Sequence, residues 1–134
     1  MIAQILGSLA AASIAAILLG SMGVEDATTT RLNVAPSLIA EFLGTFALVY
    51  VVLQTATAKG TEGNSFYGLA IGFTVLTMAY ALGGVSGGAF NPAVATGISL
   101  AGIKAWPDIW VFLVGNLAAG AVAAFVFNYV NGRD

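Results

Sequence analysis

The stretch GGVSGGAFNPAVATG, residues 83–97, decides the fold of this chain. It gathers glycines, hydroxyl side chains and an asparagine inside a protein that is 59% hydrophobic and only 7% charged. Soluble domains carry about 25% charged residues, so most of this protein's surface must face lipid or other membrane protein. We therefore expect an integral, multi-pass membrane protein with membrane lipid as its first neighbour.

Four apolar stretches are long enough to cross a membrane as helices. Crossing about 30 Å at 1.5 Å per residue takes about 20 residues, and a helix satisfies its own backbone in lipid. The predicted spans are residues 2–20, 37–58, 66–82 and 109–130. The first stretch also has the length and the small residues of a cleaved signal peptide. However, no Lys or Arg precedes Arg31, so the basic segment of such a peptide is missing and a membrane span is favoured.

The apolar piece at residues 93–102 is much shorter than a span and lies between two full spans, which predicts a re-entrant half-helix. Asn91 is suited to cap its first turn, and Pro92 to occupy the first helical position, where a missing N–H costs nothing. Irregular backbone at this depth is tolerated only where it is buried in protein or lines a water-filled cavity. The predicted fold class is an all-α membrane protein with four transmembrane helices and one re-entrant half-helix.

Charge and residue types exclude several functions. Four basic and six acidic residues give a net charge of −2 and form no basic patch, so nucleic acid is not an expected partner. The chain has no Cys and no His, which removes disulfides, thiolate chemistry and the commonest metal ligand and general base. We expect no catalytic residues, no metal and no cofactor, and we do not expect an enzyme.

The first predicted span is similar in sequence to the last. LGSLAAASIAAILL, residues 6–19, aligns without a gap with VGNLAAGAVAAFVF, residues 114–127. Two alanine-rich membrane helices can match through composition alone. Alternatively, residues 1–22 are a helix left from a preceding repeat and residues 37–130 form one complete repeat, a plan common among transport proteins. In that case the chain is a fragment, or a shortened relative of a two-repeat protein.

Several motifs together resemble one family. SGGAFNPAV, residues 86–94, resembles the SGxxxNPA box of the major intrinsic protein family, which includes the aquaporins. AEFLGTFALVYVVL, residues 40–53, resembles the helix that opens each half of such proteins, including its characteristic glutamate at Glu41. Residues 2–7 are similar to the third helix of the family and residues 109–127 to the sixth. The resemblance implies an aquaporin-like half with one extra helix before it.

In that family two half-helices meet at mid-membrane with their NPA boxes at the pore. The resemblance therefore implies that Asn91, Pro92 and Ala93 line a pore. The N-terminus of a half-helix carries roughly half a positive charge and disfavours cations and protons in a narrow channel. The asparagine amide offers a donor to a passing water or hydroxyl oxygen. The alternative is a buried capping motif that lines no pore.

The sequence departs from the family pattern at the selectivity filter. Arg usually follows the second NPA box, but Val94 stands here, and other filter positions carried over fall on Gly88 and Ala79. Such a filter has no charged donor and little bulk, so an open pore would be wider and more apolar than a water-selective one. A carboxylate within a span is a functional candidate. The resemblance instead gives Glu41 the structural task of holding backbone groups of the re-entrant loop.

Two functions therefore stay open from the sequence. The first is a channel-family protein for water or small neutral solutes, incomplete as one chain and completed by a longer parent chain or by copies of itself. The second is a pore-dead structural subunit of a larger membrane complex, for example photosynthetic or respiratory, with other membrane subunits as its partners. The absence of a second box and of the filter arginine favours the second function if the chain is complete, whereas a fragment favours the channel. We take the channel-family function as the primary prediction, because the motifs support it directly.

Overall fold

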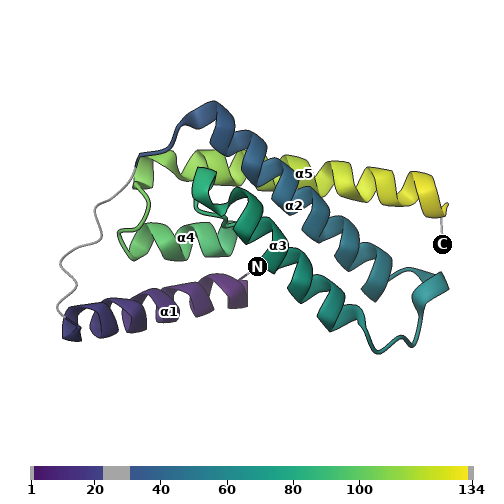
Figure 1. The fold of residues 1–134 in the computed structure, drawn as a ribbon, viewed down its shortest axis with the longest axis horizontal. Coiled ribbons are helices and arrows are strands. Elements are labelled where there is room, and N and C mark those ends of the chain that lie inside the picture. The colour runs from purple at the N-terminus through teal and green to yellow at the C-terminus, as the bar shows by residue number, and fades with distance from the viewer. Residues whose placement is uncertain (1, 23–30, 133–134) are drawn as a thin grey trace.

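The computed structural model describes residues 2–22 and 31–132, and this part of the chain is built from helices (Figure 1). The α-helices are α1 (Ile2–Ser21), α2 (Val34–Ala56), α3 (Tyr67–Ser86), α4 (Pro92–Leu100) and α5 (Ile109–Asn131), and the short 3-10 helices are η1 (Lys59–Thr61) and η2 (Trp106–Asp108). All of the α-helices except α4 are long and apolar enough to cross a membrane. The predicted class, an all-α multi-pass membrane protein with one half-helix, is confirmed for the described residues.

The helix ends differ from the predicted spans for physical reasons. α2 begins at Val34 instead of residue 37 because Pro36 falls in its first turn, where a backbone N–H has no intrahelical partner anyway. α3 continues past its predicted end at residue 82 to Ser86, and Gly87 then caps it in the left-handed conformation at φ 103°. In lipid a helix is extended wherever the sequence permits, since unpaired backbone groups are costly there.

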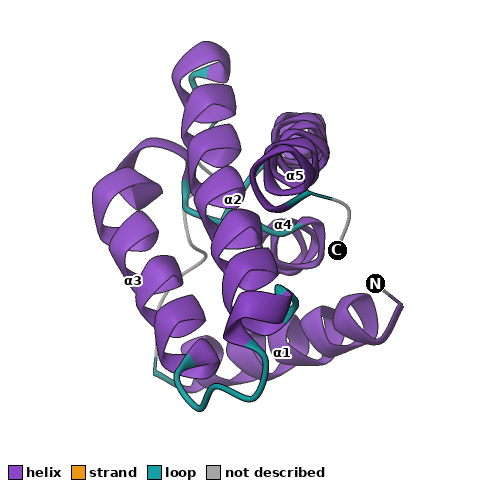
Figure 2. Cartoon of the chain, turned by 90° about the vertical axis from the view of Figure 1, so that its right-hand side faces the viewer, coloured by secondary structure: helices purple, strands orange, loops and turns teal. Residues whose placement is uncertain are grey.

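α2 is the central helix of the structure, and α5 and α3 pack on opposite sides of it (Figure 2). α5 comes close to α2 at Gly115, where an added Cβ would lie 3.1 Å from Glu41 Cβ and 3.4 Å from the Leu38 carbonyl oxygen. The buried side chains of α5 include Val111 and Phe112. The glycine thus allows the two backbones to approach, and the aromatic ring fills the space under α4.

α4 lies between α1 and α5, so the half-helix is enclosed on two sides (Figures 1 and 2). Its contact with α1 is made through small residues: an added Cβ at Gly97 would lie 3.1 Å from Ser8 Cβ. Toward α5, the fully buried Ala95 packs in a small cluster with Phe112. The half-helix is therefore packed against other helices on two sides, as expected of a re-entrant segment.

The outer helices leave a large apolar surface uncovered by the rest of the chain. α1 has no buried residue and α3 has only Ser86. On α3, an added Cβ at Gly68 or Gly72 would meet nothing within 4 Å, so these glycines do not serve helix contacts among the described residues. This surface must face lipid or further protein.

Candidate functional site

The start of the half-helix is fixed by its own asparagine. Asn91 has extended backbone, with φ −159° and ψ 128°, and its side-chain Oδ1 accepts a hydrogen bond of 2.8 Å from the Ala93 N–H. Pro92 is the first residue of α4, where its missing N–H leaves nothing unsatisfied. The predicted cap and the predicted place of the proline are both confirmed. The use of Oδ1 in the cap leaves the Asn91 amino group for other partners.

The segment that leads into α4 has an unusual backbone. After α3 ends, Gly87 and Gly88 have φ values of 103° and 66°, and Phe90 has φ 47°, the one described non-glycine residue with positive φ. Left-handed backbone at a bulky residue is uncommon and must be stabilised by its surroundings. The Phe90 ring is buried directly over Gly44 of α2, so closely that an added Cβ on Gly44 would overlap it. The absence of a side chain at residue 44 therefore makes room for the ring.

Glu41 ties this segment to α2. The side chain is fully buried, and its Oε1 accepts hydrogen bonds from Ser86 Oγ at 2.6 Å and from the Ala89 N–H at 3.0 Å. Its Oε2 accepts a bond of 2.8 Å from the Phe90 N–H. Ser86 Oγ in turn accepts a bond of 3.1 Å from the Gly88 N–H. One carboxylate thus satisfies the backbone donors that the irregular turn exposes, which is how a buried carboxylate is normally accommodated.

An open groove of about 470 Å³ runs between α1 and α4. Asn91, Ala93 and Val94 line it from the half-helix, and Gln4 and Ser8 contribute polar side chains from α1. The remaining lining is made of small or aliphatic residues, namely Gly7, Ala11, Ala12, Ala15, Gly97, Ile98, Ala101 and Ile103. Ser8 Oγ is already used, because it donates to the Ile5 carbonyl oxygen at 2.8 Å. The groove is therefore mainly apolar, with the Gln4 and Asn91 amides as its main polar groups.

Of the three predicted filter residues, Val94 lies in the groove and Ala79 and Gly88 lie outside it. Val94 is 43% exposed and lines the groove together with the NPA residues Asn91 and Ala93. Ala79 is exposed on α3, and Gly88 is half-buried in the turn before α4; the groove's lining includes neither. At Gly88 an added Cβ would lie 3.2 Å from Gly83 Cα, and φ is 66°, so this position suits glycine alone.

The residues that hold the ends of the site in place were not predicted from the sequence. Asp108, 7% exposed, accepts from the Leu32 N–H at 3.0 Å and pairs with Arg31 through Nη1 at 3.1 Å, which joins the start of α2 to η2. Between α2 and α5, Thr45 Oγ1 donates to Asn116 Oδ1 at 2.8 Å. Neither pair could be recognised from spacing, because each joins residues far apart in the chain.

No group of three or more metal-ligating side chains occurs within residues 2–22 and 31–132. What the site offers is a capped half-helix N-terminus, an uncharged wall and a pair of amide side chains. Such a surface can orient a small polar solute by hydrogen bonding, and it supplies no group for bond chemistry.

Comparison with known proteins identifies the family of this chain. The sequence model of the major intrinsic protein family matches residues 1–127. The chain belongs to that family. It is 45% identical over 105 residues to aquaporin Z of Brucella melitensis, which covers 72% of this chain and 45% of that protein.

Two plant proteins match nearly the whole chain. A probable aquaporin of the TIP type from Medicago truncatula is 33% identical over 129 residues, 95% of this chain and 51% of its own length. Aquaporin NIP1-1 of Oryza sativa is 32% identical over 129 residues, 96% of this chain and 45% of its own length. The chain thus spans about half the length of the curated relatives it matches. No solved structure matches it.

Proposed function

We propose that this chain forms part of the wall of a membrane channel for water or small neutral solutes. The observation that carries the proposal is the groove between α1 and α4, into which Asn91 and Val94 both face at the start of the half-helix. With Oδ1 held by the cap, the Asn91 amino group is free to donate to a passing water or hydroxyl oxygen. The positive end of α4 disfavours cations at the same point. The protein's relatives include named aquaporins, and we propose no enzymatic reaction for it.

The selectivity of this channel among solutes would come from the width of the pore and from the polarity of the half-helix. We propose Asn91, Pro92 and Ala93 as the pore box and Val94 as the filter position in the groove. From the family resemblance we also propose Ala79 and Gly88, which lie outside the groove's lining, as filter positions. These side chains carry no charge and little volume, which favours a wider and more apolar passage than a water-selective filter. Glu41 acts in this account as the buried support of the turn before α4.

The groove is open on one side, so a second wall must complete the channel. We propose that residues 1–22 represent the last helix of one repeat and residues 37–130 the following repeat. The complementary wall then comes from further chain of the same protein or from copies of it. The exposed apolar surfaces of α1 and α3 offer room for such contacts.

The second candidate is a pore-dead structural subunit of a larger membrane complex, for example photosynthetic or respiratory. Val94 in place of an arginine and the uncovered apolar faces of α1 and α3 favour this function. Native mass spectrometry of the detergent-solubilised protein separates the two. Release from an assembly of different subunits supports the structural subunit, whereas self-assembly or a longer parent chain supports the channel.

Solute flux into proteoliposomes, followed by stopped-flow light scattering, tests the channel directly. Val94→Arg places a long cation in the groove and should reduce glycerol flux by about tenfold or more. Val34→Arg is the matched control, because both valines are 43% exposed and Val34 lies at the first residue of α2, away from the groove. Equal flux in Val94→Arg and in the unmodified protein would show that Val94 lines no working pore.

A further inference from the structure

A second hollow lies at the opposite side of the fold from the α1–α4 groove. It occupies about 600 Å³ between the end of α2 and the start of α3 and is lined by residues 55–59, residues 61–64 and Tyr67. Its walls carry hydroxyl, amide, ammonium and carboxylate groups, whereas the α1–α4 groove is mainly aliphatic. These polar groups lie outside the proposed channel.

The loop that forms this hollow is held in one shape by Asn64. The Asn64 Nδ2 donates to the carbonyl oxygens of Thr55 and Thr61, each at 2.6 Å. Its Oδ1 accepts from the backbone N–H groups of Phe66 at 3.1 Å and Tyr67 at 2.9 Å. Thr61 Oγ1 also donates to the carbonyl oxygen of Gln54 at 2.7 Å, which binds η1 to the last turns of α2. The hollow is therefore preformed, and a ligand need not order it.

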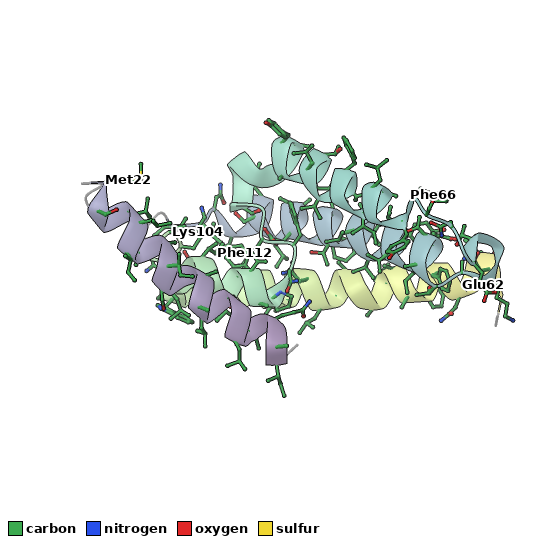
Figure 3. All side chains as sticks on the ribbon, turned by 90° about the horizontal axis from the view of Figure 1, so that it is seen from below. Met22, Glu62, Phe66, Lys104 and Phe112 are labelled. Atoms are coloured by element: carbon green, nitrogen blue, oxygen red, sulfur yellow. The ribbon has the colours of Figure 1, made fainter. Side chains whose placement is uncertain are left out.

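The place of the hollow between two membrane-spanning helices puts it at the level expected for lipid headgroups. It joins the end of one membrane-spanning helix to the start of the next, where the hydrocarbon region gives way to the polar interface. Phe66 and Tyr67 are 50% and 51% exposed beside it, as expected of aromatic side chains in the interfacial belt. Figure 3 shows Glu62 and Phe66 together at the end of the molecule away from Lys104.

Lys59 and Glu62 place opposite charges on the wall of this hollow. A lysine ammonium is suited to a phosphate as a point charge with several donors. A carboxylate disfavours a purely anionic ligand and accepts hydrogen bonds from a primary ammonium, which the face of the Tyr67 ring also attracts. We propose that the hollow binds the headgroup of a phosphatidylethanolamine-type lipid, with its phosphate on Lys59 and its ammonium on Glu62.

The proposal is independent of whether the chain conducts, and its test measures lipid binding alone. The purified protein is delipidated in detergent and titrated in native mass spectrometry with phosphatidylethanolamine, phosphatidylcholine and phosphatidylglycerol of identical acyl chains. We expect phosphatidylethanolamine to bind about tenfold more tightly than phosphatidylcholine, whose methylated ammonium cannot donate a hydrogen bond to Glu62. Equal binding of these two lipids, or tighter binding of phosphatidylglycerol, overturns the proposal.

Single substitutions test which side chain binds the ammonium and which binds the phosphate of the headgroup. Glu62→Gln should reduce the affinity for phosphatidylethanolamine to that for phosphatidylcholine, and Lys59→Gln should weaken both. Lys104→Gln, the same substitution at the far end of the molecule, should change neither. Thermal unfolding of each variant in detergent checks that the fold is retained. A Glu62→Gln protein that still prefers phosphatidylethanolamine contradicts the assigned role of the carboxylate.

Soluble phosphoethanolamine distinguishes a lipid from a free metabolite with the same chemistry. The acyl chains of a lipid anchor its headgroup beside the hollow and so raise the effective concentration of the headgroup there. Soluble phosphoethanolamine, which has no such anchor, should therefore displace the lipid only at a far higher concentration than the lipid's own. If soluble phosphoethanolamine binds as tightly as the lipid, the ligand is not a membrane lipid and the proposal is wrong.

Discussion

Replacing Glu41 by glutamine is the sharpest test of how the irregular turn is stabilised inside the membrane. Glutamine has the same length, but only one of its two terminal atoms is an acceptor. If that oxygen keeps the bonds from Ser86 Oγ and the Ala89 N–H, the new amino group faces the Phe90 N–H, and two donors meet where a 2.8 Å hydrogen bond was. In the opposite orientation the amino group faces the Ala89 N–H instead, while the Ser86 hydroxyl can turn and accept a bond from it.

The expected cost follows from these three bonds. Leaving the buried Phe90 N–H unsatisfied costs about 1–3 kcal/mol, and changing two charge-assisted bonds into neutral ones costs about 1 kcal/mol more. We therefore expect Glu41→Gln to lower the free energy of unfolding by about 2–4 kcal/mol. Folded proteins are stable by only about 5–15 kcal/mol, so the loss is readily measured.

Reversible unfolding in mixed detergent micelles, without added phospholipid, provides the assay. Glu62→Gln is the matched control, since the same substitution on an exposed loop residue should shift stability by less than about 0.5 kcal/mol. Ser86→Ala completes a double-mutant cycle, in which the coupling with Glu41→Gln should exceed about 0.5 kcal/mol because the two side chains share a bond. A Glu41→Gln protein as stable as Glu62→Gln would refute the reasoning.

Two further predictions concern packing and the tie between α2 and η2. Gly44→Ala should lower the free energy of unfolding by about 1–3 kcal/mol because the new methyl group overlaps the Phe90 ring. Gly72→Ala, whose added Cβ meets nothing within 4 Å, should be neutral or stabilising by up to about 1 kcal/mol. Thermal unfolding in detergent measures both changes, and a loss of stability in Gly72→Ala as large as that in Gly44→Ala would contradict the packing argument. Asp108→Ala should cost more stability than Arg31→Ala in the same assay. Asp108 is buried and also accepts a hydrogen bond from a backbone N–H, whereas the Arg31 side chain is 69% exposed and its ion pair is screened by solvent. A larger loss of stability in Arg31→Ala would show that the ion pair dominates.

The sequence was most informative where structure depends on neighbouring residues. The cap at Asn91 and the first helical position at Pro92 follow from local backbone chemistry, and both are found as predicted. The four membrane spans follow from length and apolarity. Helix ends were less predictable, because glycines such as Gly83 and Gly84 read as helix breakers but remain helical in α3.

Contacts between distant residues lay outside the reach of sequence reasoning. The packing of α1 against α4 depends on the contact between Gly97 and Ser8, and the sequence of either helix alone does not predict which helix it contacts. The small residues shared by residues 6–19 and 114–127 predicted that residues 1–22 belong to a preceding repeat, which stays a prediction. The bond between Asp108 and the Leu32 N–H had no such signal, since a carboxylate at a membrane surface is ordinarily solvated.

The most direct test of the central claim is the hydration of the α1–α4 groove in a lipid bilayer. The chain has no cysteine, so Val94→Cys introduces a single thiol in the groove, and Leu117→Cys introduces one on the 62% exposed, apolar outer face of α5. The thiolate is the nucleophile that attacks thiol reagents, and it forms in water and not in hydrocarbon. The channel account predicts that a charged, water-soluble thiol reagent modifies Val94→Cys on the order of tenfold faster than Leu117→Cys and lowers solute flux as it does so. Equal inertness of the two cysteines would show that no water reaches Val94, and the groove would then be a contact surface and not a channel wall.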